Sequence, residues 1–208
     1  INALKKGLSN LERHILNIKK FGLKPIVAIN HFILDSTKEI NAVLNFCENM
    51  KVEVSECKHW AQGGKGAIDL AKKVVKVCKN KKESKFKYLY KNNIGLLEKI
   101  NLITKQIYKA DKITFNDEVE KKLKFFEDNG YGRLPVCIAK TQYSFSTNPK
   151  LKGAPSNHEI PIREVRLSSG AEFIVVVCGS IMTMPGLPKK PAANSIMLNK
   201  KGEVEGLF

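Results

Sequence analysis

The chain has 208 residues, of which 43% are hydrophobic and 27% are charged, and it carries a formal net charge of +16. This length suits one large domain or two small ones, with enough apolar residues for a buried core. No apolar run approaches the roughly 18–20 residues of a membrane span, and residues 1–9 hold neither an initiator Met nor a signal peptide, so we expect a cytoplasmic piece of a longer protein.

The first part of the chain predicts alternating helices and strands. In chain order we predict a helix from the capping box Ser9-Asn10-Leu11-Glu12 to Gly22, a strand at 25–30, a helix from the capping box Ser36-Thr37-Lys38-Glu39, a strand at 52–56 and a helix after Gly63-Gly64-Lys65-Gly66. Helix and strand alternation at these lengths is typical of crossover connections. We therefore predict an α/β fold, with a parallel sheet and flanking helices over residues 1 to about 80.

A polar, Lys-rich connection at 79–87 marks a possible boundary, which divides the chain into residues 1–80 and 81–208. After it we predict helices at 94–110 and 119–128, a strand at 134–139, and strands at 162–167 and 172–178 joined by a turn. The tail at 182–208 is rich in Pro and Gly and is predicted to be irregular. Residues 81–208 are thus predicted to form a mixed α/β subdomain.

The net positive charge favours anionic partners, but the kind of basic residue does not favour nucleic acid among them. Of the 36 basic residues, 32 are Lys, and only Arg13, Arg133, Arg163 and Arg166 can offer the guanidinium forks that read bases and phosphates. The lysines are spread along the chain, with one denser run from Lys72 to Lys91. We expect a solvated, Lys-rich surface that attracts phosphates or carboxylates, and small-molecule substrates with neither nucleic acid nor membrane as partner.

Cysteine and histidine spacing predicts no metal site and no disulfide framework. The five cysteines are odd in number, scattered and without a CxxC pair: Cys47, Cys57, Cys78, Cys137 and Cys178. We interpret them as reduced core thiols. His31 and His59 each precede a loop aromatic and could meet in space, but a metal site needs more ligands than these.

Two predicted strands are each followed by a large aromatic side chain. Phe32 follows the strand at 25–30, and Trp60, the only Trp, follows the strand at 52–56. Ligands of parallel α/β sheets bind at the carboxyl ends of the strands, so the two rings could hold a planar ligand between them. Alternatively, both rings simply close the end of the sheet, and the pattern alone leaves both interpretations open.

Two further segments are candidates for a pocket wall or an anion-binding loop. Gly63, Gly64 and Gly66 precede a predicted helix, whose amino terminus favours anions, although ordinary loop glycines would give the same pattern. Thr183, Met184, Pro185 and Gly186 lie in an apolar loop with two prolines, which suits either a rigid pocket wall or a packed terminal plug. The chain has no P-loop of the form Gly-x-x-x-x-Gly-Lys-Ser/Thr.

Several spaced motifs, in order, resemble one family over essentially all of the chain. They are Gly7-Leu8-Ser9-Asn10-Leu11-Glu12-Arg13-His14-Ile15, Val27-Ala28-Ile29-Asn30, Trp60-Ala61 with Gly63-Gly64, Ala139-Lys140-Thr141-Gln142-Tyr143-Ser144, Thr183-Met184-Pro185-Gly186-Leu187-Pro188 and the closing Gly206-Leu207-Phe208. Together they resemble formate–tetrahydrofolate ligase, in its carboxy-terminal portion. The tail is more similar to the bacterial single-function enzymes than to the eukaryotic multifunctional ones.

The resemblance implies an enzyme of one-carbon metabolism that makes 10-formyltetrahydrofolate. Formate attacks the terminal phosphate of Mg-ATP to give formyl phosphate, and N10 of tetrahydrofolate then attacks the formyl carbon. In that family the aromatics that match Phe32 and Trp60 sandwich the folate ring system, and Asp35 matches a family Asp in the same loop. The full-length enzyme is expected to be a homotetramer or homodimer.

Some positions depart from the family, and one part of it is missing. The family often has Lys or Arg before Phe-Pro, where this chain has His31-Phe32-Ile33, and it often has Lys at Gln62 and Gly at Ala67. The resemblance places the P-loop that binds Mg-ATP in an amino-terminal part that this chain lacks. We therefore expect a folate-binding role and no turnover by this chain alone. The alternatives are a stand-alone basic module that binds nucleic acid or folate without catalysis, and a degenerate remnant that binds no ligand.

Overall fold

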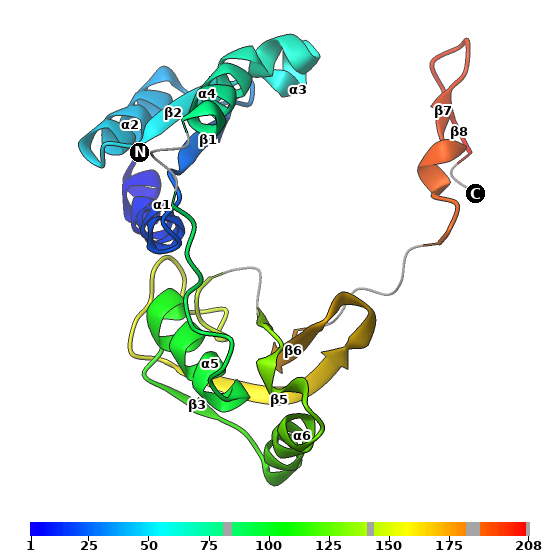
Figure 1. The fold of residues 1–208 in the computed structure, drawn as a ribbon. Helices are drawn as coiled ribbons and strands as arrows, with labels where there is room; N and C mark the ends of the chain where they lie inside the picture. The colour runs from blue at the N-terminus through cyan, green and yellow to red at the C-terminus, as the bar shows by residue number, and fades with distance from the viewer. Residues whose placement is uncertain (81–84, 141–143, 182–187, 207–208) are drawn as a thin grey trace.

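The structure is a computed structural model, which describes residues 1–80, 85–140, 144–181 and 188–206 (Figure 1). Two α/β units follow one another along the chain, each with its own sheet. The elements of the first unit are α1 (Asn2–Lys20), β1 (Ile26–Asn30), α2 (Thr37–Asn49), β2 (Glu53–Cys57), α3 (His59–Gln62), the 3-10 helix η1 (Gly63–Ala67) and α4 (Ile68–Lys79). The mixed α/β fold predicted for the chain is confirmed.

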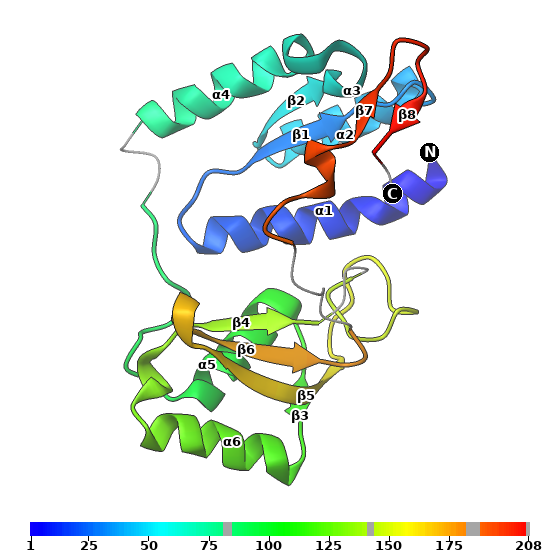
Figure 2. The ribbon, with the colours of Figure 1, turned by 90° about the vertical axis from the view of Figure 1, so that its right-hand side faces the viewer.

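The sheet of the first unit consists of β1 and β2 running parallel. Ile26 lies opposite Glu53, and Asn30 lies opposite Cys57, so both strands end at the same edge. Helix α4 covers one face of these strands, while α2 covers the other and α1 lies against α2 (Figures 1 and 2). The strands predicted at 25–30 and 52–56 are therefore parallel neighbours, joined by a crossover connection through α2.

The two predicted capping boxes had different outcomes. Ser36 begins α2 as predicted, because its hydroxyl accepts from the backbone N–H of Glu39 while the Glu39 carboxylate accepts from the N–H of Ser36. The box at Ser9 was wrong, since α1 already begins at Asn2. Ser9 lies inside the helix, where its hydroxyl donates to the carbonyl oxygen of Lys6 at 3.1 Å and so needs no cap.

The second unit is a mixed sheet with two helices on it. Its elements are α5 (Leu96–Ile103), the π-helix η2 (Thr104–Tyr108), β3 (Lys112–Thr114), α6 (Asp117–Asp128), the 3-10 helix η3 (Tyr131–Arg133), β4 (Val136–Ala139), β5 (Glu159–Ser168), the 3-10 helix η4 (Ser169–Ala171) and β6 (Phe173–Cys178). The strand order is β3-β5-β6-β4, in which only β5 and β6 are antiparallel. Its core is formed by apolar side chains of α5, α6, β5 and β6, including Leu96, Ile100, Val119, Leu123, Phe126, Ile160, Val165 and Ile174.

Most of the elements predicted for this unit are confirmed. The predicted helix at 94–110 is α5 continued by η2, and it ends where Lys109 adopts a left-handed conformation with φ 58°. The predicted hairpin is β5 and β6, joined by η4. Strand β3 was not predicted, because three residues between two helices show no alternation.

The tail is less irregular than predicted. It contains a 3-10 turn η5 (Ala192–Asn194) and a short antiparallel hairpin of β7 (Met197–Leu198) and β8 (Val204–Glu205). The proline-rich loop, with Thr183, Met184, Pro185 and Gly186, lies outside the described residues, as does the centre of the predicted boundary at 81–84. The division of the chain at residue 80 stays a prediction.

Helix α1 makes polar contacts with the second unit. Four side chains at helical spacing donate to backbone carbonyl groups there: Asn10 to Gly153, Arg13 to Ala154 and Pro155, Asn17 to Ile107, and Lys20 to Gln106. Its apolar residues include the buried Ile15. Helix α1 thus contacts both units: it lies against α2 of the first unit, and its polar side chains donate hydrogen bonds to the second.

The cysteines only partly match the prediction of core thiols. All five are free, and Cys47, Cys57 and Cys178 are buried. Cys78 on α4 and Cys137 on β4 are exposed instead. Among the described residues no helix is both long and apolar enough to cross a membrane.

Candidate functional site

The candidate site lies at the edge where β1 and β2 both end. The pairing of these strands continues one residue further, because the backbone N–H of His31 donates to the carbonyl oxygen of Cys57 at 3.0 Å. The chain then enters the loop 31–35 on one side and α3 on the other. Parallel pairing therefore brings together two segments that are about 25 residues apart in the sequence.

Phe32 and Trp60 meet at this edge, as their positions after the two strands predict. Their ring centroids are 6.2 Å apart, and the ring planes are inclined at 59°. Phe32 is 42% exposed and Trp60 is 67% exposed, so neither ring is a buried plug. The sequence placed Trp60 in a loop, but it lies on the four-residue helix α3. The two rings form one exposed aromatic surface.

Asp35 fixes the loop that carries Phe32. One oxygen of its carboxylate accepts from the backbone N–H of Phe32 at 2.8 Å, and its own N–H donates to the carbonyl oxygen of Phe32 at 3.0 Å. These two hydrogen bonds close a tight turn of the kind that Asp side chains stabilise. Ile33 and Leu34, at the tip of that turn, are 87% and 91% exposed, which extends the apolar surface beyond Phe32.

A charged cluster that sequence reasoning missed lies beside the aromatic pair. One carboxylate oxygen of Glu56 is 2.5 Å from Nδ1 of His31 and 3.1 Å from Nζ of Lys58. The hydrogen bond with His31, and after it the one with Lys58, lowers the pKa of Glu56. Glu56 is thus held ionised at neutral pH. Only the strand register, which places Ile29 opposite Glu56, could have revealed the cluster.

The glycines at 63–66 have different roles. Gly63 adopts φ 56°, a conformation that favours glycine. Gly66 lies so close to Lys58 that an added Cβ would be 2.4 Å from the Lys58 carbonyl carbon, while its own carbonyl oxygen accepts from the Lys58 N–H at 3.0 Å. Gly64 has open space around it. Gly63 and Gly66 therefore each have a structural reason to be glycine. A role of the three glycines in anion binding stays a prediction.

The start of α4 already carries a carboxylate. Asp69 lies in its first turn and accepts from the hydroxyl of Ser55 and from Nζ of Lys73, each at 2.6 Å. The hydrogen bond from Lys73, and after it the one from Ser55, lowers the pKa of Asp69. Lys73 also donates to the carbonyl oxygen of Val54 at 2.7 Å. These contacts tie α4 to β2, and any anion bound here would share the helix terminus with Asp69.

The described residues hold no cluster of three or more His, Cys, Asp or Glu side chains that could bind a metal ion. His14 instead contacts the ring of Phe145, with centroids 4.6 Å apart. His158 is buried and its Nε2 lies 3.1 Å from the carbonyl oxygen of Phe145. Burial is the first cause that lowers the pKa of both His14 and His158, which keeps the two rings neutral at pH 7.

The fold and this edge define an α/β protein with a candidate ligand site at the carboxyl ends of parallel strands, marked by two exposed aromatic rings. Comparison with known proteins gives the family. The family model described as formate–tetrahydrofolate ligase matches residues 1–208, and the chain belongs to that family. The resemblance to this family drawn from the sequence motifs is thereby confirmed, and the assignment to its carboxy-terminal portion stays a prediction.

Curated relatives with the same description match the whole chain. The formate–tetrahydrofolate ligase of Pelagibacter ubique is 58% identical over 208 residues, and those of Roseobacter denitrificans and Rhizobium rhizogenes are each 51% identical. In each case the match covers 100% of this chain and 37% of the relative. The chain thus spans little more than a third of the length of these relatives.

Proposed function

We propose that this chain supplies the tetrahydrofolate-binding side of the active site of a formate–tetrahydrofolate ligase. The complete enzyme would form formyl phosphate from formate and Mg-ATP, and then transfer the formyl group to N10 of tetrahydrofolate with release of phosphate. Membership of the family supports the reaction, and the Phe32–Trp60 pair supports the folate role of this chain. The pair carries the proposal, because two exposed rings at a strand edge suit a flat heterocycle.

A planar ligand between the rings requires a larger gap than the present one. Stacking at van der Waals contact on both sides needs ring planes about 7 Å apart and nearly parallel. The rings of Phe32 and Trp60 are 6.2 Å apart and inclined at 59°. We therefore propose that they open when the pterin enters. Trp60 would be the ring that turns, because it is 67% exposed, whereas the hydrogen bonds with Asp35 hold the backbone of Phe32.

The charged cluster gives the proposed site a polar side. Glu56 is ionised and accepts from His31 and Lys58 next to the rings. A carboxylate is a hydrogen-bond acceptor for the amino and ring N–H groups of a pterin, and basic side chains attract the carboxylates of the folate tail. We assign this polar recognition to Glu56 and Lys58, and the stacking to the two rings.

We assign the phosphate chemistry to a part of the enzyme outside this chain. Transfer of a phosphoryl group needs preorganised groups that hold the phosphates and stabilise the developing charge. The sequence contains no Gly-x-x-x-x-Gly-Lys-Ser/Thr loop for this task. Mg-ATP would therefore bind mainly to the portion of the enzyme that this chain does not cover.

Trp60 is the only Trp in the chain, so its fluorescence reports on the site directly. Titration of the chain with tetrahydrofolate should quench that emission in a saturable way. Phe32→Leu keeps the fluorophore but removes one face of the stack, and it should shift the titration to higher concentration. Phe125→Leu, which changes an exposed ring on α6, is the matched control and should leave the curve unchanged. A titration curve for Phe32→Leu identical to that of the parent chain would contradict the proposal.

A further inference from the structure

Helix α4 has two apolar faces, and in the described part of the chain only one of them packs against the strands, while the other is exposed. Leu70 and Val77 lie on the half-buried side, toward the strands of the first unit. On the other side, Ile68 and Val75 are each 49% exposed, and Ala71 lies between them at helical spacing. A surface helix with a single partner would present polar residues there, so this second stripe is unusual.

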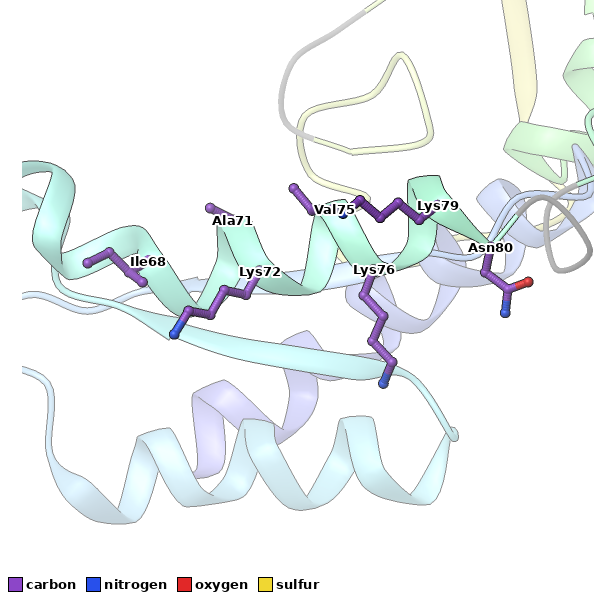
Figure 3. Close-up of a pocket in the computed structure, with 7 residues that line it drawn as sticks. All are labelled: Ile68, Ala71, Lys72, Val75, Lys76, Lys79 and Asn80. Atoms are coloured by element: carbon purple, nitrogen blue, oxygen red, sulfur yellow. The ribbon is translucent and has the colours of Figure 1, made fainter.

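The exposed stripe borders a shallow, open hollow on the surface of α4, with lysines around it. The hollow has a volume of about 810 Å³, and its lining residues all belong to α4 or to its cap: Ile68, Ala71, Lys72, Val75, Lys76, Lys79 and Asn80 (Figure 3). Ala71 and Val75 project away from β2 in this view. An apolar strip flanked by lysines is typical of an interface whose partner is apolar at its centre and acidic at its edge.

We propose that this face of α4 is covered by the portion of a formate–tetrahydrofolate ligase polypeptide that the present chain does not span. The curated relatives are far longer, since the chain covers 37% of each of them. The covering segment would place apolar side chains against Ile68, Ala71 and Val75, and carboxylates against the flanking lysines.

The sheet beneath α4 gives independent support. Within the described part of the chain, β1 and β2 pair only with each other, as a sheet of two parallel strands. Parallel sheets are usually larger and covered on both faces, because each strand needs partners along its edges. The described residues thus add no third strand to this pair and leave Ile68 and Val75 exposed on α4, which fits one large covering body better than a small ligand.

A second copy of the chain fits this face less well. A two-fold contact would place the same α4 surfaces together and bring Lys72, Lys76 and Lys79 against their own counterparts. The helix carries a single acidic residue, Asp69, which is already engaged by Ser55 and Lys73. Like charges that face one another oppose association, so the basic rim favours a partner of different sequence.

The test is reconstitution from two chains. The part of the Pelagibacter ubique relative that lies outside the matched segment would be co-expressed with the present chain, and binding would be measured by co-purification and titration. We expect a stable complex, with amide hydrogen exchange of residues 68–79 slowed on binding. Val75→Asp and Lys72→Glu should each weaken the complex at least about tenfold, as loss of a central interface contact does.

Phe125→Asp is the matched control, because Phe125 is an apolar residue 58% exposed on α6. It should leave binding unchanged, and thermal unfolding should show that every variant is folded. The proposal is overturned if the parent chain forms no complex, if Val75→Asp binds as tightly as the parent, or if exchange of residues 68–79 does not slow. If the chain instead associates with itself, and Val75→Asp abolishes that self-association, the face belongs to a second copy of the chain. These readouts do not depend on turnover, so they stand apart from the folate proposal.

Discussion

The guanidinium of Arg13 lies over the ring of Phe145, with its Cζ 5.3 Å from the ring centre. The same group donates to the carbonyl oxygens of Ala154 and Pro155, each at 3.1 Å. Arg13 belongs to α1 and all three partners belong to the second unit, so this side chain is one of those that join the two units. The planar guanidinium of Arg can stack on a ring with one face and donate hydrogen bonds along its edge, and the ammonium group of Lys cannot reproduce this geometry.

Arg13→Ala should therefore destabilise the chain. Hydrogen bonds from a charged donor contribute about 1.5–3 kcal/mol, and the carbonyl groups left behind would need other partners, so we expect a loss of about 2 kcal/mol in the free energy of unfolding. Urea denaturation measures this loss. Glu12→Ala, at the exposed neighbouring position, is the control and should change stability little. Equal stability of the two variants would contradict the role given to Arg13.

Gly66 and Gly64 form a matched pair for testing how Trp60 is positioned. A Cβ at Gly66 would meet the backbone of Lys58 at 2.4 Å, whereas one at Gly64 would meet nothing within 4 Å. Gly66→Ala should displace the start of α3, lower stability by about 1–3 kcal/mol and weaken tetrahydrofolate binding. Gly64→Ala should be close to neutral in both respects. Thermal unfolding and tetrahydrofolate titration of both variants provide the measurement, and the reverse order of effects would refute the packing argument.

The lowered pKa of Lys140 predicts that the stability of the chain depends on pH. Its side chain is buried, contacts the carbonyl oxygen of Ser144 and lies 5.1 Å from the ring centre of Tyr108, and burial lowers its pKa to about 8. An unfolded Lys titrates near pH 10.4, so between about pH 8 and 10.4 the unfolded chain binds more protons than the native one. The contribution of Lys140 to the unfolding free energy should therefore rise with pH across this window.

Comparison with Lys140→Met isolates that contribution. Burial also raises the pKa of Cys178 to about 12, which acts in the opposite sense, but Cys178 is present in both proteins and largely cancels in the difference. Urea denaturation at pH 7.5, 9 and 10.5 should show the parent gaining stability relative to Lys140→Met. A difference that stays constant or falls with pH would contradict the lowered pKa.

Much of the fold could be predicted from the sequence, because several helices and strands carry strong local signals. The capping box at Ser36 and the short apolar run at 25–30 mark elements that begin or pair as expected. The box at Ser9 failed because the same residue types occur within a helix, where a Ser hydroxyl can donate to the turn before it. Strand β3 is too short for any periodicity, since only its pairing with β5 defines it.

The candidate site was predictable only in part. Phe32 and Trp60 follow strands that the pattern identifies, so their proximity could be inferred from the fold class. The contact between His31 and Glu56 could not be inferred in this way. These residues are 25 positions apart, and their contact depends on the register between β1 and β2. The close approach of Gly66 to Lys58 likewise needs coordinates, since a glycine-rich loop looks the same whether its glycines bind anions or avoid clashes.

Catalysis should require more than this chain. We expect the purified chain to make no 10-formyltetrahydrofolate from formate, Mg-ATP and tetrahydrofolate, because nothing in its sequence forms a P-loop for the phosphates. An assay of formate-dependent ADP release measures this, with the full-length Pelagibacter ubique relative as positive control. Robust turnover by the 208-residue chain would mean that the phosphate site lies within it.

The most direct test of the folate role is calorimetric titration of the parent chain and Trp60→Ala with tetrahydrofolate. Trp60 is 67% exposed, so its truncation removes little buried surface and the variant should stay folded. Loss of one stacking ring should weaken binding by about 1–3 kcal/mol, or roughly fivefold to 150-fold. Trp60→Phe should recover part of that loss. Unchanged tetrahydrofolate affinity in Trp60→Ala would contradict the assignment of the Phe32–Trp60 pair as the folate site.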